Sequence, residues 1–295
     1  MPQVPVQLPT PGEPLRLLAV HAHPDDESSK GAASTAKYVA QGVEILVVSC
    51  TGGERGDILN SSFEIGERDI SEVRREEMAN AAEILGVSHI WLGFEDSGYP
   101  DGDPKPPLPE GSFAALPLEV VSAPLVEIVR EFRPHVITTY DENGGYPHPD
   151  HIRTHEVAIQ AWHLAADDEV EAAGEPWAVA KLYYHHSFSH KRVTALHEAC
   201  LELGITSPYG DWLQGWDTAT IGVNRVTAKI DCAEWFPARN EALLAHVTQI
   251  DPEGNWFAIP SHVETAVWPT EDYELALSRI GEIDSEDDLF IGLRG

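Results

Sequence analysis

Short apolar runs alternate with helix-like stretches through the first half of this chain. The apolar runs at residues 15–20, 43–48, 89–94 and 136–140 have the length of strands. The stretches between them, at residues 28–40, 70–85 and 118–132, repeat apolar side chains at helical spacing. Strands that alternate with helices form βαβ units, whose strands are parallel. The sequence therefore predicts an α/β fold, Rossmann-like, with a mostly parallel sheet flanked by helices.

The remaining sequence continues this fold. A helix is expected to begin near Asp150, a fifth strand at residues 181–186 and a further helix at residues 237–249. No internal repeat or clean boundary divides the chain, so we predict a single domain over residues 15–295 with a C-terminal elaboration. The first 14 residues contain five prolines and predict a flexible N-terminal arm over residues 1–14.

The charge balance limits the partners of the protein. A formal net charge of −30 argues against nucleic acid and anionic membranes, which need clustered Lys and Arg. No apolar run approaches the ~18 residues of a membrane span, and the N-terminus lacks a signal-peptide pattern. The three cysteines form no CxxC pair, which favours free thiols in a reducing compartment. We expect a cytoplasmic protein with a small-molecule partner; a homo-oligomer is compatible with the sequence.

Metal-ligand side chains follow two of the predicted strands. Residues 21–27 read His-Ala-His-Pro-Asp-Asp-Glu, and residues 146–151 read Tyr-Pro-His-Pro-Asp-His. Open α/β folds keep their sites at the carboxyl edge of the sheet. A turn that enters a helix can direct His23 and Asp26 at one point, and His151 can supply a third ligand from a neighbouring strand. Two His and one carboxylate suit catalytic zinc and also non-haem Fe(II).

The same two clusters contain candidates for acid–base chemistry. Asp25 would point away from the metal and act as general base for the attacking water, whose pKa a metal lowers toward ~7. His148 could donate a proton to the leaving amine or stabilise the developing oxyanion. Tyr146 could hydrogen-bond the carbonyl oxygen as charge builds on it. These roles predict hydrolysis of an amide.

Each feature also has a structural interpretation. Asp25, Asp26 or Ser28 could cap the following helix, and we expect His21 to be a buried structural ring. Residues 21–25 resemble the start of the metallo-β-lactamase motif, but that motif requires His at the position of Asp26 and an αββα sandwich. An Fe(II) oxygenase requires an antiparallel jelly roll, which the alternation opposes. The presence of both clusters behind strands favours the metal site.

The motifs resemble those of the LmbE/PIG-L superfamily of zinc-dependent N-deacetylases. Its signature is an early His-Pro-Asp-Asp-Glu and a later His-Pro-Asp-His, found here at residues 23–27 and 148–151. The resemblance extends over most of the chain. Longer motifs are similar to those of the amidase branch that acts on mycothiol S-conjugates; they lie at residues 21–31, 51–56, 91–98 and 141–151.

The resemblance implies a chemistry and a substrate. It implies zinc on His23, Asp26 and His151, with Asp25 as base and with His148 and Tyr146 stabilising the transition state. The substrate would be a mycothiol S-conjugate, a small-molecule thiol conjugate whose cysteinyl–glucosamine amide is cut to glucosaminyl-inositol and a mercapturic acid. Arg74 and Asp96 would hold the sugar, although Arg74 could instead be a surface partner of Glu77.

Lys30 and the function each have more than one interpretation. Lys30 follows the first cluster by one turn, and we expect it to contact the acylated cysteine of the conjugate, unless it is a solvated helix lysine. One alternative function is the deacetylation of N-acetylglucosaminyl-inositol. Another is a non-catalytic sugar-binding module, which would have no need of Asp25. The loop at residues 52–56 does not match the GxGxxG pattern of nucleotide binding.

Three long loops complete the predicted site. They follow the second, third and fourth strands, at residues 51–69, 95–117 and 141–150. Because all three leave the same edge of the sheet, we predict that they form the walls of a pocket. His246 and Glu264 are further candidate pocket residues in the C-terminal region, without support from their spacing.

Overall fold

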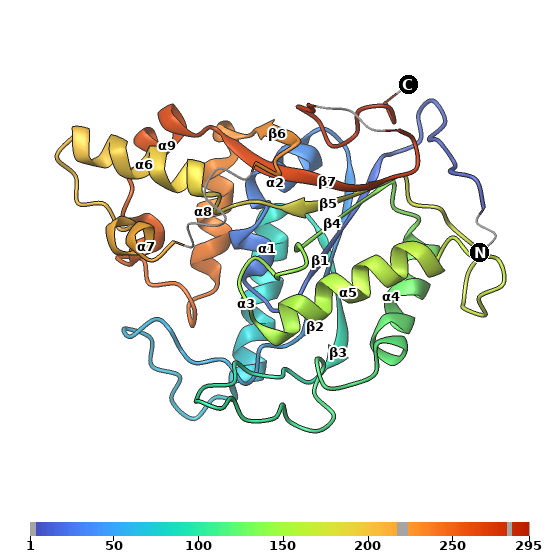
Figure 1. Cartoon of the computed structure of the whole chain (residues 1–295), viewed down its shortest axis with the longest axis horizontal. Helices are drawn as coiled ribbons and strands as arrows, with labels where there is room; N and C mark the ends of the chain where they lie inside the picture. Colours follow the sequence, from blue (N-terminus) through green and yellow to red (C-terminus); the bar gives the residue numbers. More distant parts are fainter. Residues whose placement is uncertain (1–3, 217–223, 282–284, 295) are drawn as a thin grey trace.

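A seven-stranded sheet runs through the molecule. The computed structural model describes residues 4–216, 224–281 and 285–294. The strand order is β3-β2-β1-β4-β5-β7-β6 (Figure 1). Strands β1 to β5 pair in parallel, and β7 pairs antiparallel with β5 and with β6. The strands are β1 Arg16–His21, β2 Glu44–Thr51, β3 Ser88–Phe94, β4 Val136–Thr139, β5 Lys181–His185, β6 Ala228–Asp231 and β7 Thr270–Ser278. The predicted Rossmann-like α/β fold is confirmed.

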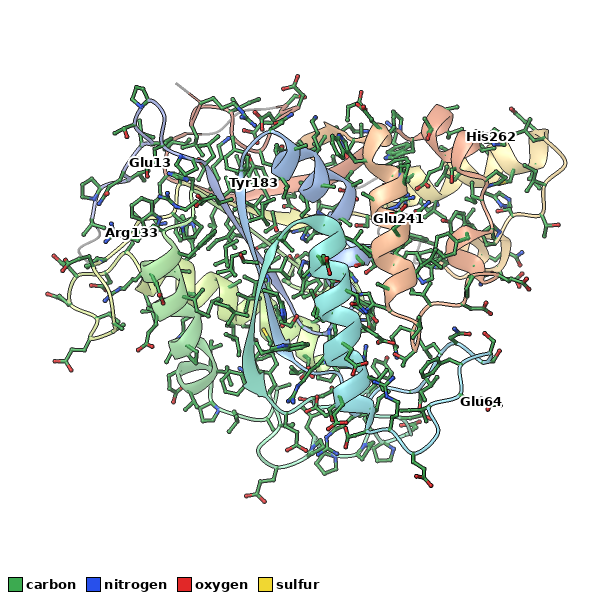
Figure 2. The ribbon with its side chains drawn as sticks, turned by 180° about the vertical axis from the view of Figure 1, so that it is seen from behind. Glu13, Glu64, Arg133, Tyr183, Glu241 and His262 are labelled. Atoms are coloured by element: carbon green, nitrogen blue, oxygen red, sulfur yellow. The ribbon has the colours of Figure 1, made fainter. Side chains whose placement is uncertain are left out.

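Helices cover both faces of the sheet. Helices α4 and α5 lie on the face toward the viewer in Figure 1, and α2 and α3 lie on the other. Figure 2 shows that other face, with α3 beside α8, which carries Glu241. The helices are α1 Asp26–Ser29, α2 Ala32–Ala40, α3 Ile70–Leu85, α4 Leu118–Phe132, α5 Pro149–Leu164, α6 His190–Glu202, α7 Gly210–Gln214, α8 Phe236–Ala245 and α9 Ser261–Val267. None of the helices in the described part of the chain is long and apolar enough to cross a membrane.

Alternate side chains of β1 belong to two hydrophobic clusters. Leu18 and Val20 pack in the cluster that contains α4 and α5. Leu17 and Ala19 pack in the other, with Tyr38 of α2. Because helices bury both faces of a parallel sheet, its strands are apolar throughout instead of alternating with polar residues. This explains why the first strand appears in the sequence as a continuous apolar run.

The segment predicted as one helix at residues 28–40 forms two helices. The chain breaks between α1 and α2 at Gly31, whose φ is 85°. A Cβ atom at Gly31 would lie 2.8 Å from the Tyr273 hydroxyl oxygen and from Cε1 of His185. Glycine is therefore required both by the backbone conformation and by the close approach of β5 and β7. Ser28, one of the residues that could have capped this helix, lies within α1, so that interpretation was wrong.

The remaining bounds agree closely with the predictions. The helices at residues 70–85 and 118–132 have the predicted bounds, while α8 ends four residues before the predicted residue 249. The described part of the N-terminal arm contains no helix or strand before β1; residues 1–3 lie outside the described residues. The C-terminal elaboration consists of α6 to α9 with β6 and β7, two strands that the sequence had not indicated.

Candidate metal centre

The two ligand clusters meet at the carboxyl ends of β1 and β4. These two strands are hydrogen-bonded neighbours. The chain continues from β1 toward β2 and β3 on one side and from β4 toward β5 on the other. Such a reversal of strand order opens a crevice in which α/β proteins bind ligands. His23 follows β1, whereas His148 and His151 lie at the start of α5 after β4.

Three side chains predicted as metal ligands converge in this crevice. His23, Asp26 and His151 are buried, and their potential ligand atoms all lie within 4.8 Å of one another. His151 Nε2 is 3.4 Å from Asp26 Oδ2, and His23 Nδ1 is 3.7 Å from the same oxygen. This group of two imidazoles and one carboxylate could hold a divalent cation.

The ring of His151 is oriented for such a role. Its Nδ1 lies 2.9 Å from the carbonyl oxygen of Gly144, so it donates there and Nε2 carries the lone pair. Nε2 is buried and has no hydrogen-bond partner among the described residues, which is costly unless a ligand satisfies it. Gly144 has φ 72°, and a Cβ atom there would lie 2.6 Å from Cβ of His151. Glycine at this position therefore allows the carbonyl to reach the ring.

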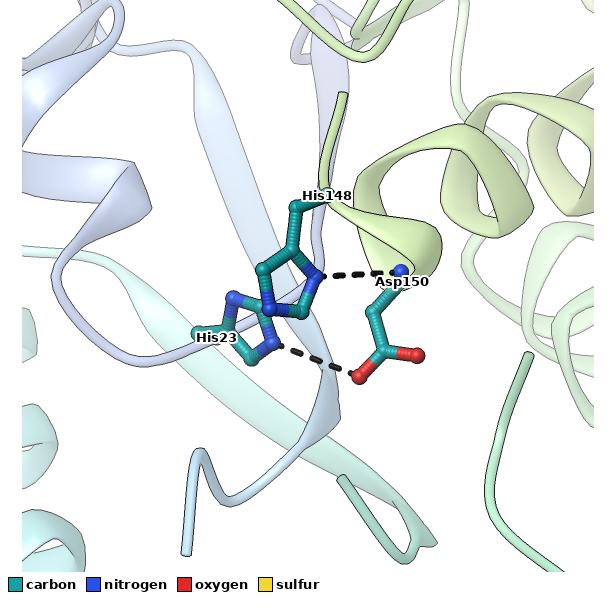
Figure 3. A group of neighbouring side chains, drawn as sticks. All are labelled: His23, His148 and Asp150. Atoms are coloured by element: carbon teal, nitrogen blue, oxygen red, sulfur yellow. Dashed lines mark hydrogen bonds and ion pairs between the residues drawn. The ribbon is translucent and has the colours of Figure 1, made fainter. Parts of the chain in front are cut away.

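A second group of potential ligands shares His23 with the first. It comprises His23, His148 and Asp150 (Figure 3). His148 Nδ1 accepts the backbone N–H of Asp150 at 3.1 Å, and Asp150 Oδ2 lies 3.4 Å from His23 Nε2. The same Asp150 oxygen accepts the backbone N–H of Ser97 at 2.9 Å. Because Asp150 contacts Nε2 of His23, it is suited to orienting the ring. The group of His23, Asp26 and His151 is therefore better suited to binding a metal.

Buried carboxylates surround the imidazole of His23. Asp26, Asp96 and Asp150 each have an oxygen within 3.7 Å of a ring nitrogen. Burial disfavours charge on the ring, but hydrogen bonds with Asp150 and Asp96 outweigh it and raise the pKa of His23 to about 10. Burial likewise opposes the charge on Asp96, yet its hydrogen bond with His23 lowers the pKa of that carboxyl. The site thus favours positive charge at its centre, as a cation site requires.

Asp25 has a strained backbone and a shifted pKa. Its φ of 105° and ψ of −25° are left-handed values that a non-glycine residue adopts at a cost, and such strain clusters at active sites. Burial and the adjacent Asp26 carboxylate raise the pKa of Asp25 to about 6. Its Oδ2 lies 3.3 Å from the guanidinium of Arg74. A carboxylate that titrates near neutrality is suited to take up a proton at pH 7.

Arg74 is buried beside Asp25. It donates to the carbonyl oxygens of Gly53 at 2.5 Å and Pro24 at 3.0 Å. Glu77 instead accepts the backbone N–H of Thr248 at 2.7 Å. The alternative prediction of a surface pair between Arg74 and Glu77 was therefore wrong, because α3 turns this face toward the site loops.

Lys30 and Tyr146 lie at the edge of the site. Lys30 Nζ is 2.6 Å from Asp26 Oδ1, so the interpretation of a solvated helix lysine was wrong; the residue follows α1 in an extended conformation. Tyr146 is 48% exposed, and its ring centre lies 4.5 Å from that of His151. Its hydroxyl group is therefore available to a ligand that enters from solvent.

Two further histidines near the site are buried. His21 is buried as predicted, and its Nδ1 lies 3.5 Å from the Tyr140 hydroxyl oxygen. His246 Nε2 lies 2.7 Å from Glu27 Oε1, which links α8 to the last acidic residue of the first cluster. No motif or spacing indicated this pair, whose partners are 219 positions apart. Glu264 lies away from these histidines, between two arginines in the lining of a separate cavity.

Comparisons with known proteins agree with this site. Residues 18–162 match the PIG-L family, described as GlcNAc-PI de-N-acetylase. The mycothiol S-conjugate amidase of Streptomyces coelicolor is 54% identical over 286 residues, covering 95% of this chain and 98% of that protein. The 1D-myo-inositol 2-acetamido-2-deoxy-alpha-D-glucopyranoside deacetylase of Streptomyces scabiei is 37% identical. That alignment covers 100% of this chain and 96% of the deacetylase. The structure of N,N'-diacetylchitobiose deacetylase from Pyrococcus horikoshii shares the fold, with a TM-score of 0.59 at 18% sequence identity. The superposition covers 88% of this chain and 83% of that one.

Fold, site and relatives together define a hydrolase that cleaves amides and has a Rossmann-like α/β fold. The similarity to these relatives covers nearly the whole chain. The chain belongs to the PIG-L (LmbE-like) family.

Replacing Asp150 tests its role in orienting His23. We expect Asp150→Asn to weaken zinc affinity about 10- to 100-fold, because an amide holds the His23 ring less firmly than a carboxylate. Titration against a chromophoric chelator measures this affinity. Asp168→Asn, at an exposed position in the loop after α5, is the matched control and should bind zinc like the wild type. Unchanged affinity in Asp150→Asn would show that Asp150 does not orient the ring.

Proposed function

We propose that the protein is a metal-dependent amidase that hydrolyses mycothiol S-conjugates. The cysteinyl–glucosamine amide would be cut to a mercapturic acid and glucosaminyl-inositol. The observation that carries this proposal is the 54% identity, over nearly the full length of both chains, to an enzyme named mycothiol S-conjugate amidase. Deacetylation of N-acetylglucosaminyl-inositol is the second candidate, supported by the 37% identity to deacetylases of that type.

The metal would be held by His23, Asp26 and His151. We propose zinc, although Fe(II) suits the same ligands. When bound, the ion would supply Lewis acidity at the substrate carbonyl. Lys30 contacts the Asp26 oxygen that faces away from the two histidines, at 2.6 Å, and so helps to fix that carboxylate. We also propose that Lys30 contacts the acylated cysteine of the substrate.

Asp25 would act as the general base. It would take a proton from the water that attacks the amide carbon and pass it on to the leaving amine. The raised pKa of about 6 leaves Asp25 mostly ionised at neutral pH, yet basic enough to hold the proton. Arg74, 3.3 Å away, would keep the carboxylate in position.

His148 and Tyr146 would stabilise charge on the carbonyl oxygen. Burial and the neighbouring His23 lower the pKa of His148 to about 4, so the ring is neutral at pH 7. Since its Nδ1 accepts a backbone N–H, Nε2 carries the hydrogen and can donate to an oxyanion. This state favours oxyanion stabilisation over proton transfer to the amine. Burial and Asp26 raise the pKa of Tyr146, so its hydroxyl remains a donor.

The sugar half of the substrate would lie toward β2 and β3. Asp96 lies two residues after the end of β3, and its Oδ2 accepts the backbone N–H of Arg55 at 3.0 Å. This bond connects two of the long loops, at residues 51–69 and 95–117, beside Arg74. We propose that Arg74 and Asp96 hold the sugar there. We place the enzyme in the cytoplasm, because its three cysteines are buried free thiols.

A substrate comparison tests the function. Zinc-loaded protein is incubated separately with a fluorescent mycothiol S-conjugate and with N-acetylglucosaminyl-inositol, and amine release is followed. We expect a higher kcat/KM for the conjugate. A higher kcat/KM for the N-acetyl substrate would assign the protein to the deacetylases instead, and release of amine from neither substrate would refute both candidates.

The base assignment has its own test. We expect Asp25→Asn to reduce kcat by about 10²- to 10⁴-fold, the usual contribution of a general base. Its zinc affinity should stay near that of the wild type, because Asp25 is not among the proposed ligands. Near-normal turnover in the zinc-loaded variant would mean that another group accepts the proton.

A further inference from the structure

A cavity of about 280 Å³ lies between α1 and the C-terminal elaboration. Four aromatic residues line it, namely Phe188, Tyr209, Trp212 and Trp256. The ring centre of Phe188 lies 5.5 Å from that of Trp212 and 5.7 Å from that of Trp256. The two tryptophans are 43% and 44% exposed. Large apolar side chains that gather at the surface around a hollow mark a binding site.

The cavity adjoins the metal centre through α1. Ser29, which lines the cavity, is the last residue of α1 and follows Asp26 by three positions, a rise of about 4.5 Å along a helix. The Ser29 hydroxyl oxygen lies 3.1 Å from Lys30 Nζ, which in turn lies 2.6 Å from Asp26 Oδ1. A wall of the cavity is thus separated from a proposed metal ligand by a single side chain.

The charged groups that line the cavity are paired within the protein. Glu264 lies 2.7 Å from the guanidinium groups of both Arg192 and Arg239. Glu271 accepts two backbone N–H groups at the start of α2. Asp272 accepts from a neighbouring indole and a threonine hydroxyl. Since these groups already have partners, the aromatic faces are the surface offered to a ligand, which favours an uncharged, flat group.

Along the sheet edge, the metal centre lies between Asp96 of the proposed sugar site and the part of the cavity beside β5 and β7. In the sheet order, β2 and β3 flank β1 on one side, while β5 and β7 flank β4 on the other. Asp96 follows β3, whereas Phe188 follows β5 and residues 270–272 belong to β7. A substrate with its sugar at Asp96 and its amide at the metal centre would place its acyl half toward β5 and the cavity.

We propose that this cavity binds the S-substituent of the conjugate and prefers aromatic or other flat apolar groups. The proposal rests on the proposed function, since only a thiol conjugate carries such a group on its acyl half. The volume suffices, because an apolar cavity of ~150 Å³ already holds benzene. Stacking on Phe188, Trp212 and Trp256 would distinguish conjugates by their thioether substituent.

Paired substrates test the assignment. We would measure kcat/KM for S-benzyl and S-methyl mycothiol and compare their ratio between variants. In Trp212→Ala and Trp256→Ala the ratio of benzyl to methyl should fall roughly tenfold, the effect of losing one stacking partner. Leu201→Ala, an exposed apolar position on α6, is the matched control and should keep the wild-type ratio. Both tryptophans are half-exposed, and circular dichroism verifies that the variants fold.

The possible failures are distinguishable. Cleavage of both conjugates with the same benzyl-to-methyl ratio in wild type and tryptophan variants would overturn the subsite and leave the proposed function intact. If the wild type cleaves neither conjugate, the proposed function fails. The subsite is then tested by a binding measurement. S-benzyl-N-acetylcysteine, the acyl-side product, is then titrated calorimetrically. Binding that weakens in Trp256→Ala but not in Leu201→Ala supports the subsite, whereas no binding to the wild type, or equal binding to all variants, refutes it.

Discussion

The burial of several carboxylates in one crevice is the constraint on which the rest of the site depends. Burying a carboxylate is costly unless a cation or strong donors compensate it. Here Asp96 and Asp150 share the Nε2 of His23, Lys30 pairs with Asp26, and Arg74 pairs with Asp25. The buried Nε2 of His151 has no hydrogen-bond partner within the described chain. A divalent cation beside Asp26 would complete this arrangement.

Backbone geometry holds these groups in place. Gly144 brings a carbonyl against His151, Gly31 ends α1 against β5 and β7, and Asp25 adopts a left-handed conformation. Each of these features either stores backbone strain or depends on a glycine that leaves room for a neighbouring residue. Packing elsewhere must therefore stabilise it. The covered faces of the sheet, where Leu18 and Tyr38 lie in separate clusters, supply that rigidity.

The core fold and the C-terminal elaboration have different roles in the proposed function. The parallel strands position the proposed metal ligands, and solved structures of low sequence identity share this fold. The aromatic cavity is instead lined, apart from Ser29, by residues between positions 187 and 272. We infer that reaction type is set by the strand ends and substrate choice by the later segments. One catalytic scaffold can then serve conjugates of different size.

Much of the fold was predictable because local signals and tertiary packing agree. The helix at residues 70–85 has apolar spacing and a glycine at its end. His23, Asp26 and His151 converge because parallel strands end at one edge. The break at Gly31 was not predictable from local signals, since the residues that leave no room for a side chain there, His185 and Tyr273, are distant in sequence.

Two other features lacked a usable sequence signal. Strand β7 is rich in acidic residues, which are depleted in strands; Glu271 is satisfied there by backbone N–H groups of α2, more than 230 positions away. The carboxylate of Asp150, at the start of α5, is indistinguishable in sequence from one that complements a helix dipole. Its contact with His23 joins residues 127 positions apart.

The central claim is that one metal ion lies among His23, Asp26 and His151. Anomalous scattering from crystals of the zinc-loaded protein, recorded at the zinc absorption edge, locates the ion directly. We expect a single peak about 2.0–2.2 Å from Nδ1 of His23, a carboxylate oxygen of Asp26 and Nε2 of His151. A peak among His23, His148 and Asp150, or no peak in a preparation that cleaves substrate, would contradict this assignment.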